Sequence, residues 1–178
     1  HLFNKYINLQ VQCSGRHWEA LFNFIKDARV GSFFAVNSNI SIIKDREFHY
    51  VYRNQFLESC TKKVDNEVND WYNTKFVVND ENNENYNYIE SVSFPKPIFS
   101  LGLKIRNWTY GDKFYNNQSR SYKSLKKVFI NKKISVFDKA IYPIILDSND
   151  EIIYIPRIYQ RYDFDCKNDN LVTLSWVN

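Results

Sequence analysis

Glycine is scarce in this chain of 178 residues, which contains only four glycines, at positions 15, 31, 102 and 111. Phosphate-binding loops need closely spaced glycines, because the backbone must approach the phosphate oxygens closely. With so few glycines, the sequence can form neither a P-loop, nor a GxGxxG loop, nor an SGGxDS-type pyrophosphatase loop. The chain therefore has no recognisable ATP-binding loop. Methionine is absent and the first residue is His1, so we expect that residues upstream have been removed and that the chain is a fragment.

Catalytic and metal-binding patterns are also missing. The three cysteines, Cys13, Cys60 and Cys166, are far apart and form no CxxC pair. We therefore expect reduced thiols rather than a zinc or redox site. His17 and His49 belong to no HExxH motif, and no GxSxG elbow is present. The sequence thus predicts no catalytic residue and no metal site.

No stretch of the chain approaches the ~18 consecutive apolar residues of a membrane span, and the N-terminus lacks the layout of a signal peptide. Hydrophobic residues make up 44% of the chain and aromatic residues 17%. This composition is globular. It predicts a soluble protein without a membrane partner, and the unpaired cysteines favour the cytoplasm.

Charge divides the chain into three parts. Residues 58–92 contain three basic and eight acidic side chains, whereas the flanking parts are basic. Within this stretch, NDENNENYN (79–87) has no apolar periodicity and is typical of an exposed loop. We therefore predict one domain over 1–60, an acidic and Asn-rich connector over 61–92 that includes a possible strand at 71–78, and a second domain over 93–178.

The first part begins with a helix pattern. Ser14 is the candidate N-cap of a helix over 15–29, and Gly31 follows its end. Apolar residues recur at helical spacing along this segment and predict the inward face of the helix: Trp18, Leu21, Phe22 and Ile25. Short β-like runs follow at 33–36, 40–44 and 48–53. The sequence thus predicts one helix on a small antiparallel meander.

The second part mixes strands and helices. Extended segments are predicted at 86–94 and 98–106, a hairpin from 144–146 and 152–155, and a closing strand at 171–177. A basic amphipathic helix is predicted over 119–130, with Tyr122, Leu125 and Phe129 turned inward. Ser135 and Asp138 resemble a capping box that opens a short helix. The predicted fold is α+β, with two small domains that each pack one or two helices on an antiparallel sheet.

Residues 104–139 carry the most informative pattern, with ten basic side chains against two acidic ones. Such a stretch would attract a phosphate backbone. A lysine-rich face that only contacts solvent, on a protein-interaction or structural module, explains the charge equally well. Charge alone leaves both interpretations open.

The stretch LKIRNWTYGDKF…SYKSLKKVFINKKISVFDKAIYPIILDSNDEIIYIPRI (103–158) resembles the C-terminal domain of the tRNA(Ile)-lysidine synthetase family. The shared features are RxxxxGD, then KxLK, then a lysine-bearing turn, then proline followed by an apolar hairpin. Residues 13–53 are similar to the family's middle substrate-recognition domain, where SxxHxE opens a helix that a meander follows. The C-terminal motif favours this family over a second candidate from RNA biology, a fragment of a synthetase β-subunit with a similar fold.

The resemblance implies that the parent protein is an ATP-dependent carbon–nitrogen ligase that attaches lysine to the wobble cytidine of isoleucine tRNA. It implies ATP and Mg²⁺ as cofactors of the parent and none for this fragment. Its expected partners are isoleucine tRNA and the N-terminal catalytic domain of the same chain. The fragment itself is expected to grip tRNA in the acceptor-stem region and to be non-catalytic.

We assign the candidate tRNA contacts to the basic residues of the 104–139 stretch that flank the GD turn or lie outside the apolar helix face: Arg106, Lys113, Lys123, Lys126, Lys127, Lys132 and Lys133. Gly111 and Asp112 are predicted to form a structural turn. Glycine provides backbone freedom there, and the aspartate can accept nearby backbone N–H groups.

Overall fold

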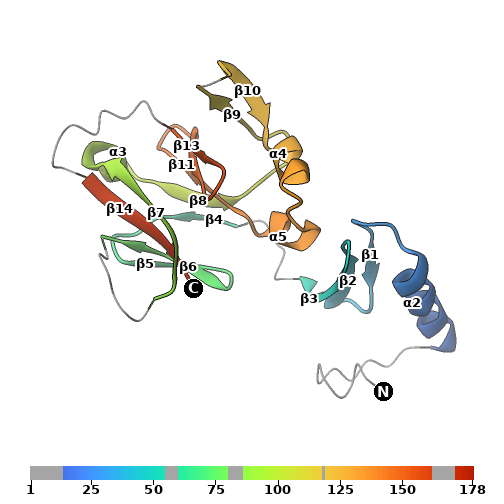
Figure 1. The fold of residues 1–178 in the computed structure, drawn as a ribbon. Helices are drawn as coiled ribbons and strands as arrows, with labels where there is room; N and C mark the ends of the chain where they lie inside the picture. The colour runs from blue at the N-terminus through green and yellow to red at the C-terminus, as the bar shows by residue number, and fades with distance from the viewer. Residues whose placement is uncertain (1–13, 55–59, 80–85, 118, 162–170) are drawn as a thin grey trace. The chain divides into compact units, whose positions relative to one another are not determined.

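The computed structural model describes residues 14–54, 60–79, 86–117, 119–161 and 171–178. The chain forms two compact units (Figure 1). The smaller unit contains residues 1–58 together with 134–140, and the larger unit contains 59–133 together with 141–178. Both combine antiparallel strands with a few helices. The predicted α+β class is confirmed.

The smaller unit is a helix on a three-stranded meander, as the sequence predicts. Helix α2 (Gly15–Asp27) begins at Ser14, whose hydroxyl accepts a hydrogen bond from the backbone N–H of His17. The sheet has the order β1-β2-β3, with bounds Phe33–Ala35, Ile40–Lys44 and His49–Arg53. Its core joins the helix to the sheet through Leu21, Val36, Ile40 and Ile42.

The inward face of α2 is narrower than the sequence predicts. Leu21 is buried and Phe24 packs against the same core. By contrast, Trp18, Phe22 and Ile25 are 37%, 66% and 40% exposed. The prediction that all three face inward is wrong, because a three-stranded sheet covers only one side of the helix.

A second short helix, α5 (Val136–Ala140), belongs to the smaller unit although it lies far along the chain. The backbone N–H of Asp138 donates to the Ser135 hydroxyl over 2.8 Å, so the predicted cap is present. The ring of Phe137 stacks on Tyr50 of β3, with 5.0 Å between centroids and 8° between planes. This stacking explains why the segment joins the meander.

The larger unit is built on two antiparallel sheets. One has the order β13-β12-β11-β8-β4, with bounds Tyr159–Gln160, Ile152–Ile155, Pro143–Leu146, Lys104–Asn107 and Thr61–Lys63. The other has the order β5-β6-β14-β7, with bounds Val68–Trp71, Thr74–Val78, Leu171–Val177 and Tyr88–Pro95. The two share one core, to which Phe76, Phe94, Ile105, Ile145 and Leu174 contribute. The predicted hairpin around 147–150 and the strands at 86–94 and 171–177 are confirmed.

The acidic stretch 61–92 differs from the prediction of a connector. It provides β4 to the first sheet and β5, β6 and β7 to the second, so the larger unit begins near residue 59 rather than 93. The possible strand at 71–78 is a hairpin that turns at Tyr72, where φ is 51°. In β5 and β6 the charged side chains of Asp70 and Lys75 are exposed, whereas Trp71, Phe76 and Val77 are buried. A count of charge does not detect these buried apolar positions. The predicted loop at 79–87 lies mostly outside the described residues.

Of the predicted strand at 98–106, only the second half is confirmed, as strand β8. Residues Lys96–Ser100 form helix α3, which Pro97 favours because proline fits the first turn of a helix and has no N–H for a sheet. Gly102, at φ 95°, then redirects the chain into β8.

The predicted helix over 119–130 is also divided in two. Strand β10 (Ser121–Ser124) pairs with β9 (Lys113–Asn116), and helix α4 begins only at Leu125 and ends at Asn131. Leu125 and Phe129 are buried as predicted, but Tyr122 is 71% exposed and does not face inward. The pairing with β9 determines this outcome, because it satisfies the backbone of residues 121–124 before the helix begins.

Candidate nucleic-acid interface

The candidate site is the basic segment from Lys113 to Lys133, which contains seven basic residues and no acidic residue. It forms the β9–β10 hairpin and helix α4, which project from the side of the larger unit opposite α3 (Figure 1). The exposed basic side chains of this segment are Lys113, Arg120, Lys123, Lys126, Lys127, Lys132 and Lys133. We call this set the basic surface.

Helix α4 turns its lysines outward because its apolar residues anchor it. Leu125 and Phe129 are fully buried, and the Phe129 ring contacts Trp108 at 5.4 Å and Tyr142 at 5.0 Å between centroids. Residues one and two positions after Leu125 must then point away from the core. Lys126 and Lys127 are accordingly exposed.

Three cations outside the basic surface form ion pairs with acidic side chains. Lys104 pairs with Asp150 over 2.6 Å, and Arg161 pairs with Glu151 over 2.9 Å. The side chains of Lys113, Lys123 and Lys127 take part in no ion pair in this part of the chain. Their charges are therefore presented to solvent and available to an anionic ligand.

Arg106 differs from the other predicted contacts. Its Nη1 and Nη2 atoms donate to Oδ2 and Oδ1 of Asp112 over 2.9 and 2.8 Å, and Nη1 also donates to the carbonyl oxygen of Asn107. Only 19% of its side chain is exposed. A guanidinium engaged in this way stabilises the turn, so we remove Arg106 from the set of candidate phosphate contacts.

The Gly111-Asp112 segment is a tight turn in the structure. Gly111 has φ 104°, which an L-residue with a side chain rarely adopts. The Asp112 carboxylate also accepts hydrogen bonds from the backbone N–H of Thr109, over 2.7 Å, and from the Thr109 hydroxyl. Burial alone would raise the pKa of Asp112, but the hydrogen bonds from Arg106 and Thr109 outweigh it and lower that pKa.

Asp112 also connects the turn to α4. Its carbonyl oxygen accepts a hydrogen bond from the backbone N–H of Leu125 over 3.0 Å. The first N–H groups of a helix lack partners within the helix, and the Ser124 side chain makes no cap here. The turn, the hairpin and the basic helix are therefore held together at one residue.

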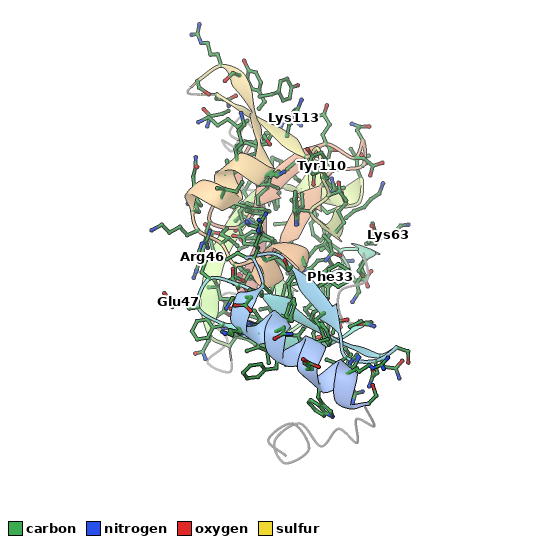
Figure 2. All side chains as sticks on the ribbon, turned by 90° about the vertical axis from the view of Figure 1, so that its right-hand side faces the viewer. Phe33, Arg46, Glu47, Lys63, Tyr110 and Lys113 are labelled. Atoms are coloured by element: carbon green, nitrogen blue, oxygen red, sulfur yellow. The ribbon has the colours of Figure 1, made fainter. Side chains whose placement is uncertain are left out.

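Three exposed tyrosines accompany the lysines, and the sequence prediction did not include them. Tyr110, Tyr115 and Tyr122 are 82%, 42% and 71% exposed. Lys126 places its Nζ atom 4.8 Å from the centre of the Tyr110 ring. Figure 2 shows Tyr110 and Lys113 next to each other at the base of the hairpin. The sequence does contain a signal for two of them. Tyr115 and Tyr122 flank NNQSRS (116–121), a run of turn-forming residues that is typical of a hairpin tip.

The described residues show neither a metal site nor a membrane helix. Within the described ranges, no three His, Cys, Asp or Glu side chains gather closely enough to hold a metal ion. No helix in that part of the chain is long and apolar enough to cross a membrane.

Comparison with known proteins places this surface in a family. Residues 103–176 match the family model of the TilS substrate C-terminal domain. The tRNA(Ile)-lysidine synthase of Thermosipho africanus (strain TCF52B) is 32% identical over 74 residues, which are 42% of this chain and 16% of that protein. The tRNA(Ile)-lysidine synthase of Shouchella clausii (strain KSM-K16) is 28% identical over 71 residues, 40% of this chain and 15% of that protein. The matched part thus spans about one sixth of these relatives.

The fold is also similar to that of a solved structure. A crystal structure of a TilS C-terminal domain superimposes with a TM-score of 0.55 at 16% identity, covering 67% of this chain and 97% of that chain. The α+β fold of this chain is therefore similar to that of a TilS C-terminal domain. Residues 103–176 are thus similar to the TilS substrate C-terminal domain, and the relatives that match over this length are tRNA(Ile)-lysidine synthases.

Proposed function

We propose that this chain is the tRNA-gripping part of a tRNA(Ile)-lysidine synthase and that the basic surface on α4 and the β9–β10 hairpin contacts the tRNA phosphates. The observation that carries the proposal is the coincidence of two features in one segment. The family match covers residues 113–133, and this segment exposes seven cations without an acidic residue.

The physical basis is electrostatic. Each lysine that neutralises a phosphate releases condensed counterions, so affinity falls steeply as salt rises. A folded tRNA presents phosphates and sugar hydroxyls along its helical arms, and these are recognised by shape rather than by sequence. Exposed lysines on a rigid helix suit such contacts, because the buried Leu125 and Phe129 fix the helix on the core.

The ligation chemistry belongs to the remainder of the parent protein in this proposal. By analogy with the named relatives, the parent joins lysine to the wobble cytidine of isoleucine tRNA with ATP and Mg²⁺, in the cytoplasm. This chain contributes tRNA binding and no catalytic residue. The competing function is a protein-interaction or structural module whose lysines only contact solvent.

The test is a filter-binding titration of isoleucine tRNA against the variant Lys126→Ala/Lys127→Ala at several salt concentrations. We expect weaker binding to cognate and non-cognate tRNA alike, and a salt slope shallower by roughly one unit for each phosphate that the variant no longer neutralises. Folding should be unaffected, since exposed substitutions usually change stability by less than about 0.5 kcal/mol.

A matched control removes the same charge elsewhere. Lys75 on β6 and Lys96 on α3 are exposed, and α3 lies across the larger unit from α4 (Figure 1). The variant Lys75→Ala/Lys96→Ala should bind tRNA with the wild-type salt slope. If both double variants weaken binding equally, only net charge matters. If neither changes it, the solvated-face interpretation is correct.

A further inference from the structure

The β9–β10 hairpin displays an aromatic pair that phosphate binding does not need. Tyr115 and Tyr122 are direct cross-strand partners. Their ring centroids lie 5.4 Å apart at an interplanar angle of 71°, and the two residues are 42% and 71% exposed. Exposing large aromatic surface to water is unfavourable, so this pair calls for an explanation.

Strand alternation directs the pair to the outer face of the hairpin. Phe114, between Lys113 and Tyr115, is buried and packs on Tyr159 with 4.6 Å between centroids. Because successive side chains alternate between the two faces of a strand, Lys113 and Tyr115 must point away from that contact. Tyr122 lies opposite Tyr115 and therefore shares its face, with Ser124 opposite Lys113.

The hairpin holds this face in a fixed position. Four residue pairs join β9 to β10, Phe114 anchors one strand on Tyr159, and the Asp112 turn fixes the base. Stacking on a rigid aromatic ring costs little side-chain entropy, since tyrosine has few rotatable bonds. The aromatic face is thus preorganised for a flat ligand.

The surroundings of the pair indicate the chemistry of that ligand. Lys113 lies on the same face, Arg120 is exposed at the adjoining turn, and no acidic residue occurs from Lys113 to Lys133. Aromatic rings interleaved with cations are typical of surfaces that bind single-stranded nucleic acid, where bases stack and phosphates are neutralised. A peptide ligand would gain nothing from so many cations unless it were strongly acidic.

We infer that Tyr115 and Tyr122 form a stacking platform for an unpaired RNA base, with Lys113 neutralising a neighbouring phosphate. This inference rests on the proposed function and adds a second mode of recognition to it. The lysines of α4 contact the backbone of a helical arm, whereas the tyrosine pair takes a base that lies outside the helix. Aromatic stacking tolerates any base, because every base has a π-face.

The experiment uses the whole chain and two RNA probes. One probe is an RNA hairpin that ends in a short single-stranded tail, and the other is the same hairpin with a blunt end. The variants are Tyr122→Leu, which removes the aromatic face while keeping an apolar side chain, and Tyr122→Phe, which keeps the ring. Circular dichroism confirms that each variant is folded, which we expect for so exposed a position.

We expect Tyr122→Leu to lose about 5- to 150-fold in affinity for the tailed probe, the range of base stacking on an aromatic side chain. Tyr122→Phe should retain wild-type affinity, and the blunt probe should bind all three proteins equally. The loss should be the same factor at every salt concentration, because stacking releases no counterions. A fluorescent adenine analogue in the tail should be quenched by the wild type and by Tyr122→Phe only.

Two outcomes overturn the platform alone. If the wild type binds both probes with a steep salt slope and Tyr122→Leu behaves identically, then the proposed tRNA grip stands and the platform is wrong. Equal losses on tailed and blunt probes would also exclude an unpaired base. A wild type that binds neither probe but captures an acidic peptide through Tyr122 would contradict both the platform and the proposed function.

Discussion

Arg106 and Asp112 form a two-point ion pair across the turn that joins β8 to β9, with N–O distances of 2.9 and 2.8 Å. The Asp112 side chain is only 9% exposed. The same residue accepts the first N–H of α4 through its backbone carbonyl. The pair therefore determines where both the basic helix and the tyrosine hairpin lie relative to the two sheets of the larger unit.

Replacing Asp112 by alanine should lower the free energy of unfolding by about 2–4 kcal/mol. The change leaves the largely buried Arg106 guanidinium without its carboxylate, and an uncompensated charge is costly. We expect tRNA affinity to fall as well, because the base of the hairpin loosens. Urea denaturation and filter binding measure the two effects. The control is Asp150→Ala, which breaks the exposed pair with Lys104 and should cost less than about 1 kcal/mol. Loss of binding without loss of stability would contradict a structural role for Asp112.

Low pH should weaken the ion pair between Arg106 and Asp112. The folded protein lowers the pKa of Asp112, because hydrogen bonds from Arg106 and Thr109 outweigh the effect of burial. A carboxyl whose folded pKa is depressed contributes stability above its ordinary pKa of about 4, and this contribution is lost as pH falls through the folded value. The stability difference between wild type and Asp112→Asn should therefore be constant near neutral pH and shrink below about pH 4. A difference that stays unchanged in acid would show that the charge of Asp112 is not what stabilises the turn.

Asn107 should be a second stabilising residue of the larger unit. Its Oδ1 accepts a hydrogen bond from the backbone N–H of Cys60, and its Nδ2 donates to the Tyr72 hydroxyl, both over 2.7 Å. These bonds connect β8 to the segment before β4 and to the β5–β6 turn. Asn107→Ala should cost about 1–3 kcal/mol, since it removes partners from partly buried polar groups. Tyr72→Phe, which removes one of the two bonds, should cost less in the same urea titration. Equal costs would mean that the contact with Cys60 contributes nothing.

The two sides of α2 should respond differently to truncation. Leu21 is 2% exposed, so Leu21→Ala should cost about 2–5 kcal/mol, as for other buried leucines. Phe22 is 66% exposed, and Phe22→Ala should change stability by less than about 0.5 kcal/mol. Thermal unfolding followed by circular dichroism separates the two. A large cost at Phe22 would indicate that its ring is covered in solution.

Local features of this chain follow from neighbouring residues and could be predicted without the structure. The Ser14 cap, the strand at 40–44 and the hairpin around 147–150 each depend on a few adjacent side chains. The basic segment is likewise a property of composition, and lysines next to buried apolar residues of a helix must point outward. The α+β class and the location of the candidate surface were therefore accessible from the sequence.

Features that depend on contacts between distant residues could not be predicted from the sequence alone. Residues 121–124 match a helical period, yet they pair with β9, whose Phe114 packs on the distant Tyr159. Arg106 resembles any other cation in the sequence until Asp112 engages both of its terminal nitrogens. The acidic stretch 61–92 has the composition of a connector. In the structure, however, Trp71 and Phe76 of this stretch pack in one core with residues of β14 and β7. In each case a contact between residues far apart in sequence, or across a turn, outweighs the local preference, because burial of large side chains and pairing of buried charges contribute more free energy than propensity does.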